Sequence, residues 1–567
     1  MIMDQYQENF DAHTENLSRA LYTYFSDKEE KKNLPVLDQL LRRLVRVQVQ
    51  MGRSFLNPSE TLEITGIPTE LNAIGAEHEK CPLVFTEKGR LYFRRYFQYE
   101  YEIAQCLRRL GEQTEPSLAS KAESLFNEKF RSSVDEFQAL AIAVAMHQRW
   151  MLLCGGPGTG KTRTMVIFLS LLLQIEPKTQ VALVAPTGKA AFRLQQALEQ
   201  VMIELGLPDS LKSQVSSFSK TYTIHRLLGV VHGSVDFYKN KTNQLPHDLV
   251  VVDEASMVDL PVMSKLFQSL KPSARIILSG DADQLSPVQG GGVFNSLVRA
   301  SDLNKFLQND LPLLSKFSSV PLASDRSHSL TGHVVALMKS HRQDHSNEGR
   351  NLGILCNLIS KGDAGEVLSF VHDHNEGIEL IESLDDSKLE TKLSEGFENL
   401  RQAEKVEDAL STLNDFRVLC AHNLGRYGVD QWNERAKCSM MSSEEMFSPI
   451  VVSTNDYGLD LFNGDDGVQK EEKAYFSKGG GVREFAKSRL SSTSSAFAIS
   501  IHRSQGSEYG RVLLVLPPPE AKLLSRELLY VAVSRAKQGI VLVGDPESLA
   551  SAVRQVGDVQ SGVFELI

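Results

Sequence analysis

A glycine-rich motif, Gly155-Gly-Pro-Gly-Thr-Gly-Lys161-Thr162, constrains this chain more than any other feature of its sequence. It follows the short apolar run Met151–Cys154 and precedes a segment with helical spacing, so it should join a buried strand to a helix. In that setting backbone N–H groups close around phosphate oxygens, and the following helix directs the positive end of its dipole at them. The pattern G-x-x-x-x-G-K-[ST] therefore predicts a nucleotide site rather than a chance glycine-rich turn.

Every member of this motif is expected to contact the nucleotide, and the residues are Gly155, Gly156, Pro157, Gly158, Thr159, Gly160, Lys161 and Thr162. The Lys161 ammonium should reach the β- and γ-phosphates, and the Thr162 hydroxyl should ligate magnesium. The cofactors predicted from this motif are ATP and Mg²⁺.

An acidic pair completes the hydrolytic chemistry. Asp253 and Glu254 follow the apolar run Leu249-Val-Val-Val, which places them at the carboxyl end of a buried strand. Alone, such a pair is often only a helix cap. In the same sheet as the phosphate motif, Asp253 is expected to hold the magnesium through water and Glu254 to polarise the attacking water.

A further polar residue, Gln284, follows the strand candidate Ile276-Ile-Leu-Ser. A neutral amide there can bond the γ-phosphate and change its contacts when that phosphate leaves, which would make Gln284 a sensor of nucleotide state. A plain turn around Asp281 and Asp283 is the alternative.

Composition limits the class of protein. The 567 residues leave room for about three or four domains. A net charge of −10 argues against a purely electrostatic nucleic-acid coat but leaves room for a local basic channel. The six cysteines form no C-x-x-C pair, so neither zinc nor an iron–sulfur cluster is predicted. The polar, acidic start and the lack of an apolar run of ~20 residues favour a cytoplasmic protein.

The fold class predicted from the alternation of apolar runs and helical patterns is α/β, with parallel sheets covered by helices. A mostly helical domain is expected at 1–112, a first α/β domain at 113–345 and a second at 346–567. Gly, Asn, Asp and Ser with short apolar pieces at about 448–495 predict a small β module inserted in the second.

Within the first of these regions, Arg90–Tyr101 is dense in arginine and aromatic residues. The segment is interpreted either as a buried amphipathic core element or as a docking surface, since Tyr and Arg are common interface anchors.

Taken together, the motifs resemble those of superfamily 1 DNA helicases, and most specifically the RecD family, the α subunits of exodeoxyribonuclease V (RecBCD-type) complexes. Besides the glycine-rich motif, the segments that carry the resemblance are Val134-Asp-Glu-Phe-Gln138, Ala185-Pro-Thr-Gly-Lys-Ala-Ala191, Thr223-Ile-His-Arg-Leu-Leu228, Asp253-Glu-Ala-Ser-Met257, Gly280-Asp-Ala-Asp-Gln-Leu285, Ile501-His-Arg-Ser-Gln-Gly-Ser-Glu508 and Tyr530-Val-Ala-Val-Ser-Arg-Ala-Lys537. The resemblance implies two RecA-like P-loop domains, with the helical domain before them and a small β-barrel inserted in the second, at about 448–495.

The same resemblance implies roles for three more nucleotide residues. Gln138 is similar to the residue that reads the adenine, and Arg535 to the arginine finger of the last motif. Arg342, in Leu337-Met-Lys-Ser-His-Arg, looks like a second arginine aimed at the γ-phosphate, with an ordinary surface arginine as the alternative. An arginine supplied by the second domain would stabilise the transferring phosphoryl group only when the cleft is closed.

DNA contacts are implied for six residues, Thr187, Lys189, His225, Arg226, His502 and Arg503. Backbone-directed contacts of this kind are blind to sequence, as a translocating motor requires. Where the family has Thr and Lys near the later motif, this chain has Ser500 and Arg503, which keep the hydroxyl and the charge. Each residue alone could be a helix cap or a surface charge.

Two other segments are open to interpretation. Val230–His247 is expected to form a hairpin, which either parts the duplex, as a hairpin here can in related helicases, or is merely exposed. Asn463-Gly-Asp465 resembles a family turn beside the DNA path, and N-G is in any case a turn signal.

The resemblance implies an ATP-dependent 5′→3′ helicase in double-strand break repair and recombination. It acts on single-stranded DNA and duplex ends, in a heterotrimer with RecB-like and RecC-like subunits. Because no cluster of spaced acidic residues and lysine marks a nuclease, that activity is expected on a partner. An ATP-switched clamp subunit and a stand-alone RecD-like helicase remain as alternatives.

Overall fold

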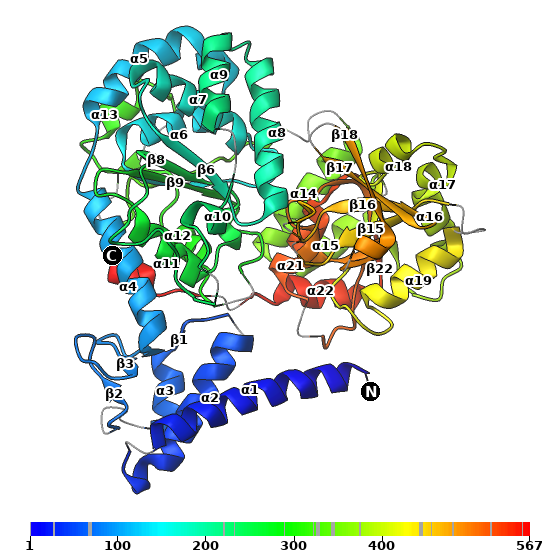
Figure 1. Ribbon diagram of the computed structural model, residues 1–567, viewed down its shortest axis with the longest axis horizontal. Helices are drawn as coiled ribbons and strands as arrows, with labels where there is room; N and C mark the ends of the chain where they lie inside the picture. The colour runs from blue at the N-terminus through cyan, green and yellow to red at the C-terminus, as the bar shows by residue number, and fades with distance from the viewer. Residues whose placement is uncertain are drawn as a thin grey trace. The chain divides into compact units, whose positions relative to one another are not determined.

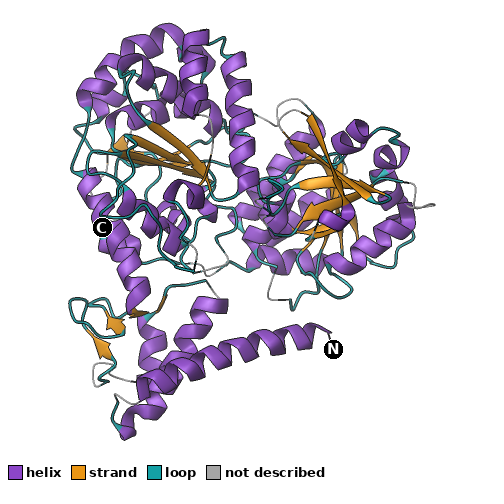
Figure 2. Ribbon diagram, in the orientation of Figure 1, coloured by secondary structure: helices purple, strands orange, loops and turns teal. Residues whose placement is uncertain are grey.

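The computed structural model describes residues 2–26, 29–50, 52–65, 71–218, 222–231, 233–287, 290–320, 323–324, 329–341, 346–373, 376–440, 446–454, 456, 458–478, 481–490, 492–521, 524–557 and 560–567. Figure 1 shows the chain and Figure 2 its helices and strands. The chain divides into two compact units. The amino-terminal unit contains Asp4–Ala282, Ser286–Ser340 and Asp558–Ile567, and the carboxyl-terminal unit contains Met1–Met3, Asp283–Leu285 and His341–Gly557.

A six-stranded parallel sheet forms the centre of the amino-terminal unit, in the order β12-β5-β9-β8-β6-β7. Its strands are β5 (Trp150–Cys154), β6 (Val181–Ala185), β7 (Tyr222–Thr223), β8 (Leu249–Val252), β9 (Arg275–Gly280) and β12 (Val334–Ala336). The apolar runs Met151–Cys154, Leu249–Val252 and Ile276–Ser279, which the sequence predicts as strands, thus lie in β5, β8 and β9 of one parallel sheet. This confirms the predicted α/β class.

Helices cover both faces of this sheet because successive residues of a buried strand point to opposite sides. Leu249 and Val251 pack with one group of helices, and Val250 and Val252 with the other. The first group is α5 (Pro116–Lys129), α6 (Glu136–His147), α7 (Lys161–Ile175), α8 (Gly188–Glu204) and α9 (Asp209–Phe218), with α13 (Leu311–Leu314) beside them. The second is α4 (Arg94–Gly111), α10 (Ile224–Leu228), α11 (Leu260–Ser269), α12 (Val293–Ala300) and α23 (Val563–Leu566). A small parallel pair, β10 (Lys305–Phe306) and β11 (Ala323–Ser324), lies outside the sheet.

The N-terminal region is mostly helical but also contains a four-stranded sheet that the sequence did not predict. Its helices are α1 (Ile2–Ser26), α2 (Leu34–Gln50) and α3 (Pro58–Thr65). Its strands are β1 (Phe55–Leu56), β2 (Ile74–Gly75), β3 (Leu83–Phe85) and β4 (Leu91–Phe93), in the order β1-β4-β3-β2.

The arginine- and aromatic-rich segment serves mainly as a core element of this region. Phe97 and Tyr99 are buried, whereas Tyr101 is exposed. The Arg94 guanidinium donates to the backbone oxygens of Ala76, Glu77 and Cys81. Most of this segment therefore supports the fold and is not available to a partner.

The carboxyl-terminal unit has its own five-stranded parallel sheet, in the order β13-β22-β21-β14-β20. Its strands are β13 (Ile378–Ile381), β14 (Phe416–Cys420), β20 (Ala498–Ser500), β21 (Tyr509–Val515) and β22 (Ala536–Val543). One face packs on α14 (Asn347–Lys361), α15 (Ala364–Asp373), α21 (Arg526–Ser534) and α22 (Pro546–Arg554). The other packs on α16 (Lys388–Gly396), α17 (Glu398–Gln402), α18 (Val406–Thr412) and α19 (Val429–Met440).

A second sheet in this unit occupies the predicted insertion. Its strands are β15 (Ser448–Val452), β16 (Asp466–Lys470), β17 (Lys473–Lys478), β18 (Gly481–Ala486) and β19 (Thr493–Ser495). All its pairs are antiparallel, in the order β18-β17-β16-β15-β19, around a small core that includes Val452 and Phe476. A β module is therefore present at this position, while its closure into a barrel stays a prediction.

Across the described ranges, no helix combines the length and the apolar character that crossing a membrane would require.

Candidate nucleotide and DNA site

The phosphate motif joins β5 to α7, as its sequence predicts. Gly158 and Gly160 have φ angles of 74° and 84°, which side chains with a Cβ adopt only at a cost. A Cβ on Gly155 would lie 2.5 Å from Thr159 Oγ1. The Gly155 N–H also donates to Gly280 O at 3.1 Å, which ties the loop to the end of β9. The glycines are thus required by the shape of the loop itself.

Lys161 begins α7, and its ammonium folds back over the loop. It donates to the backbone oxygens of Gly155 and Gly156, the latter at 3.2 Å. The Thr159 hydroxyl donates to Gly156 O at 2.9 Å and braces the same turn. The ammonium is thus held beside the backbone N–H groups that would surround a phosphate.

Gln138 supports the phosphate loop through a hydrogen bond to its backbone. It lies on α6 with only 1% of its surface exposed, and its Nε2 donates to Thr159 O at 3.0 Å. Its Oε1 accepts from the Asp135 N–H at 3.1 Å, while Asp135 Oδ1 accepts from the Gln138 N–H at 2.9 Å, a reciprocal capping box. Gln138 therefore fixes the phosphate loop, and its expected contact with adenine stays a prediction.

The acidic pair stands at the carboxyl end of β8. The Asp253 N–H donates to Val184 O at 2.8 Å, and Asp253 Oδ1 accepts from Ser279 Oγ at 3.0 Å. Burial and the neighbouring Glu254 charge raise the pKa of Asp253 to about 6, although the Lys161 ammonium and the Ser279 hydrogen bond lower it in part. Because Gly155 is bonded to Gly280 and Asp253 to the preceding Ser279, the end of β9 joins the phosphate loop to the acidic pair.

Glu254 has a φ angle of 51°, in the left-handed region that non-glycine residues rarely adopt. Such a conformation costs on the order of 1–3 kcal/mol and concentrates at functional sites. The residue expected to polarise water is thus held in a strained backbone conformation by the strand before it and the 3₁₀ turn Ala255–Met257 after it.

The remaining nucleotide residues are placed less directly. Gln284 is buried in the turn after β9, within the short segment 283–285 that groups with the carboxyl-terminal unit. Arg342 lies outside the described residues. Arg535 is 4% exposed, and its guanidinium donates to Val531 O, Ser507 O and Ser534 Oγ, each at 3.1 Å. Its role as an arginine finger stays a prediction that requires these bonds to exchange.

Two protein segments of the amino-terminal unit that are predicted to contact DNA lie side by side. Ala185 pairs with Thr223, so the turn after β6 lies beside the turn after β7. The Thr187 hydroxyl accepts from the Ala190 N–H and caps α8, on which Lys189 lies. The carboxyl ends of adjacent parallel strands, where ligands usually bind, thus carry both segments.

On α10, His225 and Arg226 are exposed. The Arg226 guanidinium lies 5.1 Å from the Tyr222 ring, and the His225 ring meets Phe237 edge to face at 5.7 Å. The Thr223 hydroxyl caps this short helix by accepting from the Arg226 N–H at 3.2 Å. The two side chains are therefore presented to solvent from an ordered turn.

The carboxyl-terminal unit repeats this arrangement. Ser500 ends the edge strand β20, as Thr223 ends the edge strand β7. Ser500 Oγ accepts from the Arg503 N–H at 3.4 Å at the start of α20 (Ile501–Ser504), and His502 and Arg503 are exposed. The sequences Thr223-Ile-His-Arg226 and Ser500-Ile-His-Arg503 thus build the same turn after the edge strand of each sheet. Comparing the two four-residue stretches could have shown this repeat, and with it the capping roles of Thr223 and Ser500, which sequence reasoning missed.

The described part of Val230–His247, which excludes residue 232, contains a short hairpin. Val230 bridges Phe237, and the Tyr238 N–H donates to Gly229 O at 2.9 Å, while residues 239–243 form bends. Val235 and Tyr238 are exposed on it. At Asn463-Gly-Asp465 the chain turns as predicted, with a φ of 88° at Gly464. A role of either segment at the DNA stays a prediction.

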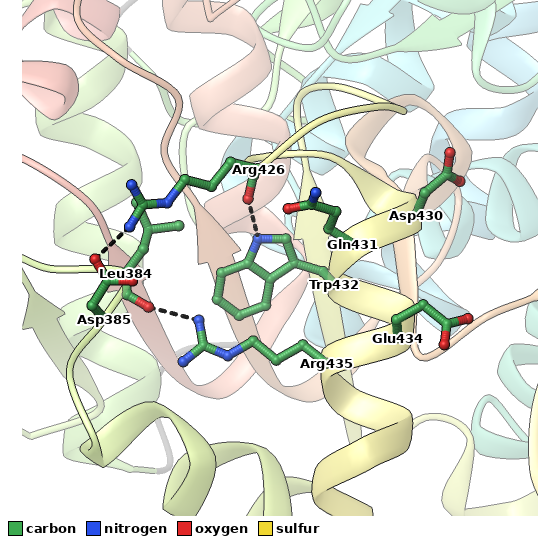
Figure 3. A pocket seen from close by; sticks show the side chains of 8 residues that line it. All are labelled: Leu384, Asp385, Arg426, Asp430, Gln431, Trp432, Glu434 and Arg435. Atoms are coloured by element: carbon green, nitrogen blue, oxygen red, sulfur yellow. Dashed lines mark hydrogen bonds and ion pairs between the residues drawn. The ribbon is translucent and has the colours of Figure 1, made fainter. Parts of the chain in front are cut away.

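A pocket of the carboxyl-terminal unit lies apart from all these residues. Figure 3 shows Trp432 of α19 between Arg426, which pairs with Asp385, and Arg435. The Trp432 Nε1 donates to Arg426 O at 3.2 Å. None of the residues predicted to bind nucleotide or DNA lines this pocket.

Comparison with known proteins agrees with this geometry. The AAA domain family matches residues 138–290, and the UvrD-like helicase C-terminal domain family matches residues 495–543. The first range holds the phosphate loop, the acidic pair and the Thr223 turn. The second holds the Ser500 turn and Arg535.

Among curated proteins, the chain is similar to the RecBCD enzyme subunit RecD of Mycobacterium tuberculosis, with 35% identity over 496 residues that cover 83% of this chain and 79% of that protein. The RecBCD enzyme subunit RecD of Haemophilus influenzae is 30% identical over 534 residues, which cover 86% and 81%. The ATP-dependent RecD2 DNA helicase of Deinococcus radiodurans is 27% identical over 474 residues, which cover 81% of this chain but 56% of that longer protein. At this identity and coverage, the chain belongs to the RecD family of RecBCD enzyme subunits and is a superfamily 1 DNA helicase.

Proposed function

We propose that this chain is the ATP-driven motor subunit of a RecBCD-type helicase–nuclease. It moves 5′→3′ along single-stranded DNA from duplex ends, in the repair of double-strand breaks and in homologous recombination. The proposed location is the cytoplasm, because that is where the DNA of a bacterium lies. The proposal rests on the family and on one observation. The Gly155 N–H donates to Gly280 O, and the adjacent Ser279 hydroxyl donates to the Asp253 carboxylate, so the phosphate loop and the acidic pair are both bonded to the end of β9.

In this site the eight residues from Gly155 to Thr162 hold the triphosphate, and Lys161 exchanges its bonds to Gly155 O and Gly156 O for phosphate oxygens. The Thr162 hydroxyl and Asp253 would hold Mg²⁺, which when bound neutralises charge on the phosphates. The residues fit this role, because a half-buried carboxylate at the end of a strand, oriented by the Ser279 hydroxyl, is the kind of oxygen ligand that Mg²⁺ prefers. Glu254 orients the attacking water.

Arg535, with Arg342, is proposed to stabilise the transferring phosphoryl group. Its guanidinium must then give up at least one of its three bonds within the carboxyl-terminal unit. This exchange would make hydrolysis depend on the state of that unit. Gln284 would report the loss of the γ-phosphate.

DNA contact is proposed at the two matching turns and at Thr187 and Lys189. His225 and Arg226 grip the strand from one sheet, and His502 and Arg503 from the other. Alternating release of the two grips during the ATP cycle would ratchet the motor along the strand.

The organisation proposed for the chain follows the sequence boundaries. Residues 113–345 and 346–567 form the two RecA-like motor domains, and 448–495 is a small barrel of the Src-homology-3 type. Residues 1–112 dock on RecB-like and RecC-like subunits, one of which carries the nuclease. Because the arginine- and aromatic-rich segment is largely buried, docking would use the exposed Tyr24 and, from the end of that segment, the exposed Tyr101.

The central test is Lys161→Gln, with Lys178→Gln as the matched control because Lys178 is exposed and outside the phosphate loop. We expect Lys161→Gln to abolish DNA-stimulated ATP hydrolysis while single-stranded DNA binding survives, and the control to behave as wild type. Unchanged hydrolysis in Lys161→Gln would remove the proposal.

Strand displacement on 5′-tailed and 3′-tailed duplexes tests polarity. Displacement only from the 5′ tail is expected, whereas ATP hydrolysis without displacement on either substrate would indicate an ATP-switched clamp. Purification from cell extract tests the partners. Recovery with large RecB-like and RecC-like chains is expected, and an active lone chain would instead indicate a stand-alone helicase.

A further inference from the structure

A buried carboxylate on α4, that of Glu100, joins three segments of the amino-terminal unit. Glu100 is fully buried, and its Oε1 accepts from Ser54 Oγ at 2.5 Å, Ser561 Oγ at 3.0 Å and the Gly562 N–H at 2.8 Å. Hydrogen bonds to a charged acceptor are stronger than neutral ones, and removing a buried partner leaves donors unsatisfied. Glu100 therefore fastens the N-terminal loop and the last segment of the chain to one helix.

That last segment, residues 560–567, is called the strap. It belongs to the amino-terminal unit although the chain has just left the carboxyl-terminal unit at Gly557. Its helix α23 lies against α4, with Val563 fully buried between α4 and α12 (Figure 1). Arg90 pairs with Glu565 at 2.6 Å.

The strap fits its seat closely at Gly562. A Cβ at this position would lie 2.1 Å from the Tyr92 hydroxyl oxygen and 2.7 Å from Glu100 Oε2. A side chain at 562 therefore cannot be added without moving the strap away from Glu100.

The segment that follows the turn of the proposed nucleotide sensor is bonded to the same loop. Residues 283–285, which include Gln284, group with the carboxyl-terminal unit, and the chain returns to the amino-terminal unit at Ser286. A few residues later the Gly291 N–H donates to Gly52 O at 2.6 Å, next to Ser54. On α12, Ser296 Oγ accepts from the Ser561 N–H at 2.9 Å.

The chain enters the amino-terminal unit at Ser286 and again near its end. After each entry, a segment a few residues further on, Gly291 in one case and the strap in the other, is bonded at one junction. This junction is formed by Gly52–Leu56, Glu100 and the strap. We propose that this junction transmits the nucleotide state of the motor to the N-terminal region. A shift of the sensor turn or of the carboxyl-terminal unit displaces Gly291 or the strap, and both are bonded to the segment that begins β1. This inference rests on the proposed function, since it assumes that the motor binds and hydrolyses ATP.

Hydrogen–deuterium exchange of the full chain tests the junction. We compare the Mg²⁺ complexes of ADP and of a non-hydrolysable ATP analogue. In the wild type, exchange in 52–56 and 94–111 should differ at least twofold between the two nucleotides, as should exchange in 155–175. In Gly562→Val the difference in 52–56 and 94–111 should be lost, while the difference in 155–175 and the basal ATP hydrolysis rate persist.

Gly365→Ala is the matched control, because its added Cβ meets only Asp363 Oδ1, at 3.4 Å. It should keep both nucleotide-dependent differences. Glu100→Gln keeps the volume of the side chain and serves if Gly562→Val fails to fold; it should reduce the difference in 52–56 and 94–111 at least twofold. The readout is the dependence on nucleotide, which a merely structural role of Glu100 would not change.

A wild-type difference confined to 155–175, or an undiminished difference in Gly562→Val or Glu100→Gln, would overturn the junction and leave the proposed function standing. No protection of 155–175 by either nucleotide, relative to the nucleotide-free chain, would instead contradict nucleotide binding itself, and the junction would fall with it.

Discussion

Gln138 offers the sharpest test of how this site works, because two roles for it predict different nucleotide specificities. Its Nε2 holds Thr159 O and its Oε1 holds the Asp135 N–H, so the side chain braces the phosphate loop. The family resemblance assigns it to the adenine instead. Gln138→Glu separates the two roles, since a carboxylate can still accept from Asp135 but cannot donate to Thr159.

The magnitude follows from the bonds that are lost. A buried hydrogen bond contributes about 1 kcal/mol, and a buried acceptor left without its donor costs about a further 1–2 kcal/mol. If the intact loop is needed to bind phosphate, a loss of roughly 2–3 kcal/mol weakens the nucleotide by roughly 30- to 150-fold. Gln138→Ala removes both bonds and should weaken it at least as much.

The assay is DNA-stimulated hydrolysis of ATP and of GTP, with kcat/KM measured for each. A braced loop serves any triphosphate, so both values should fall by similar factors. If GTP hydrolysis is unchanged while ATP hydrolysis falls, the side chain reads the base, and the argument from its internal hydrogen bonds is wrong.

Three further predictions follow from single side chains. Ser279→Ala removes the hydroxyl that donates to Asp253, so the pKa of that carboxyl should rise above its value of about 6. The acid limb of the pH profile of kcat/KM should then move up by about one pH unit. An unmoved limb would show that the protonation of Asp253 does not control kcat/KM. Burial lowers the pKa of His333 to about 4, so between about pH 6.5 and pH 4 His333 is protonated in the unfolded chain but not in the folded chain. The free energy of unfolding, measured by urea denaturation, should therefore be about 2 kcal/mol lower at pH 5 than at pH 7. His333→Phe, which can still stack on Trp150, should flatten that dependence, and an equally steep slope in this variant would assign it to other groups. Thr223→Asp and Ser500→Asp keep a helix cap but place a carboxylate at the proposed DNA site. Each should weaken single-stranded DNA binding at least fivefold at low salt, with the melting temperature little changed. Binding equal to that of the wild type would show that these turns do not contact DNA.

The central sheets could be predicted from the sequence because each buried parallel strand is a short apolar run bounded by polar residues, as in Leu249–Val252 and Phe416–Cys420. The small N-terminal sheet could not. Its strands have only two or three residues, such as Phe55–Leu56 and Ile74–Gly75, too few to show an alternation. Tertiary packing, not local pattern, selects these strands.

The nucleotide residues were predictable to the extent that their chemistry is local. The phosphate loop and the acidic pair lie where strands β5 and β8 of one sheet end, so the pattern of apolar runs was enough to bring them together. The internal bonds of Gln138 and Arg535 depend on Thr159, Val531 and Ser507, whose backbone oxygens carry no signal in the sequence.

The two matching turns show why a hydroxyl, rather than any capping side chain, fits the proposed DNA site. Thr223 and Ser500 each accept a backbone N–H of the following arginine, and this orders a helix too short to be stable alone. A hydroxyl that accepts one bond still has its own hydrogen to donate, whereas an ionised carboxylate has none. The same atom can therefore cap the turn on one side and donate to a phosphate oxygen on the other.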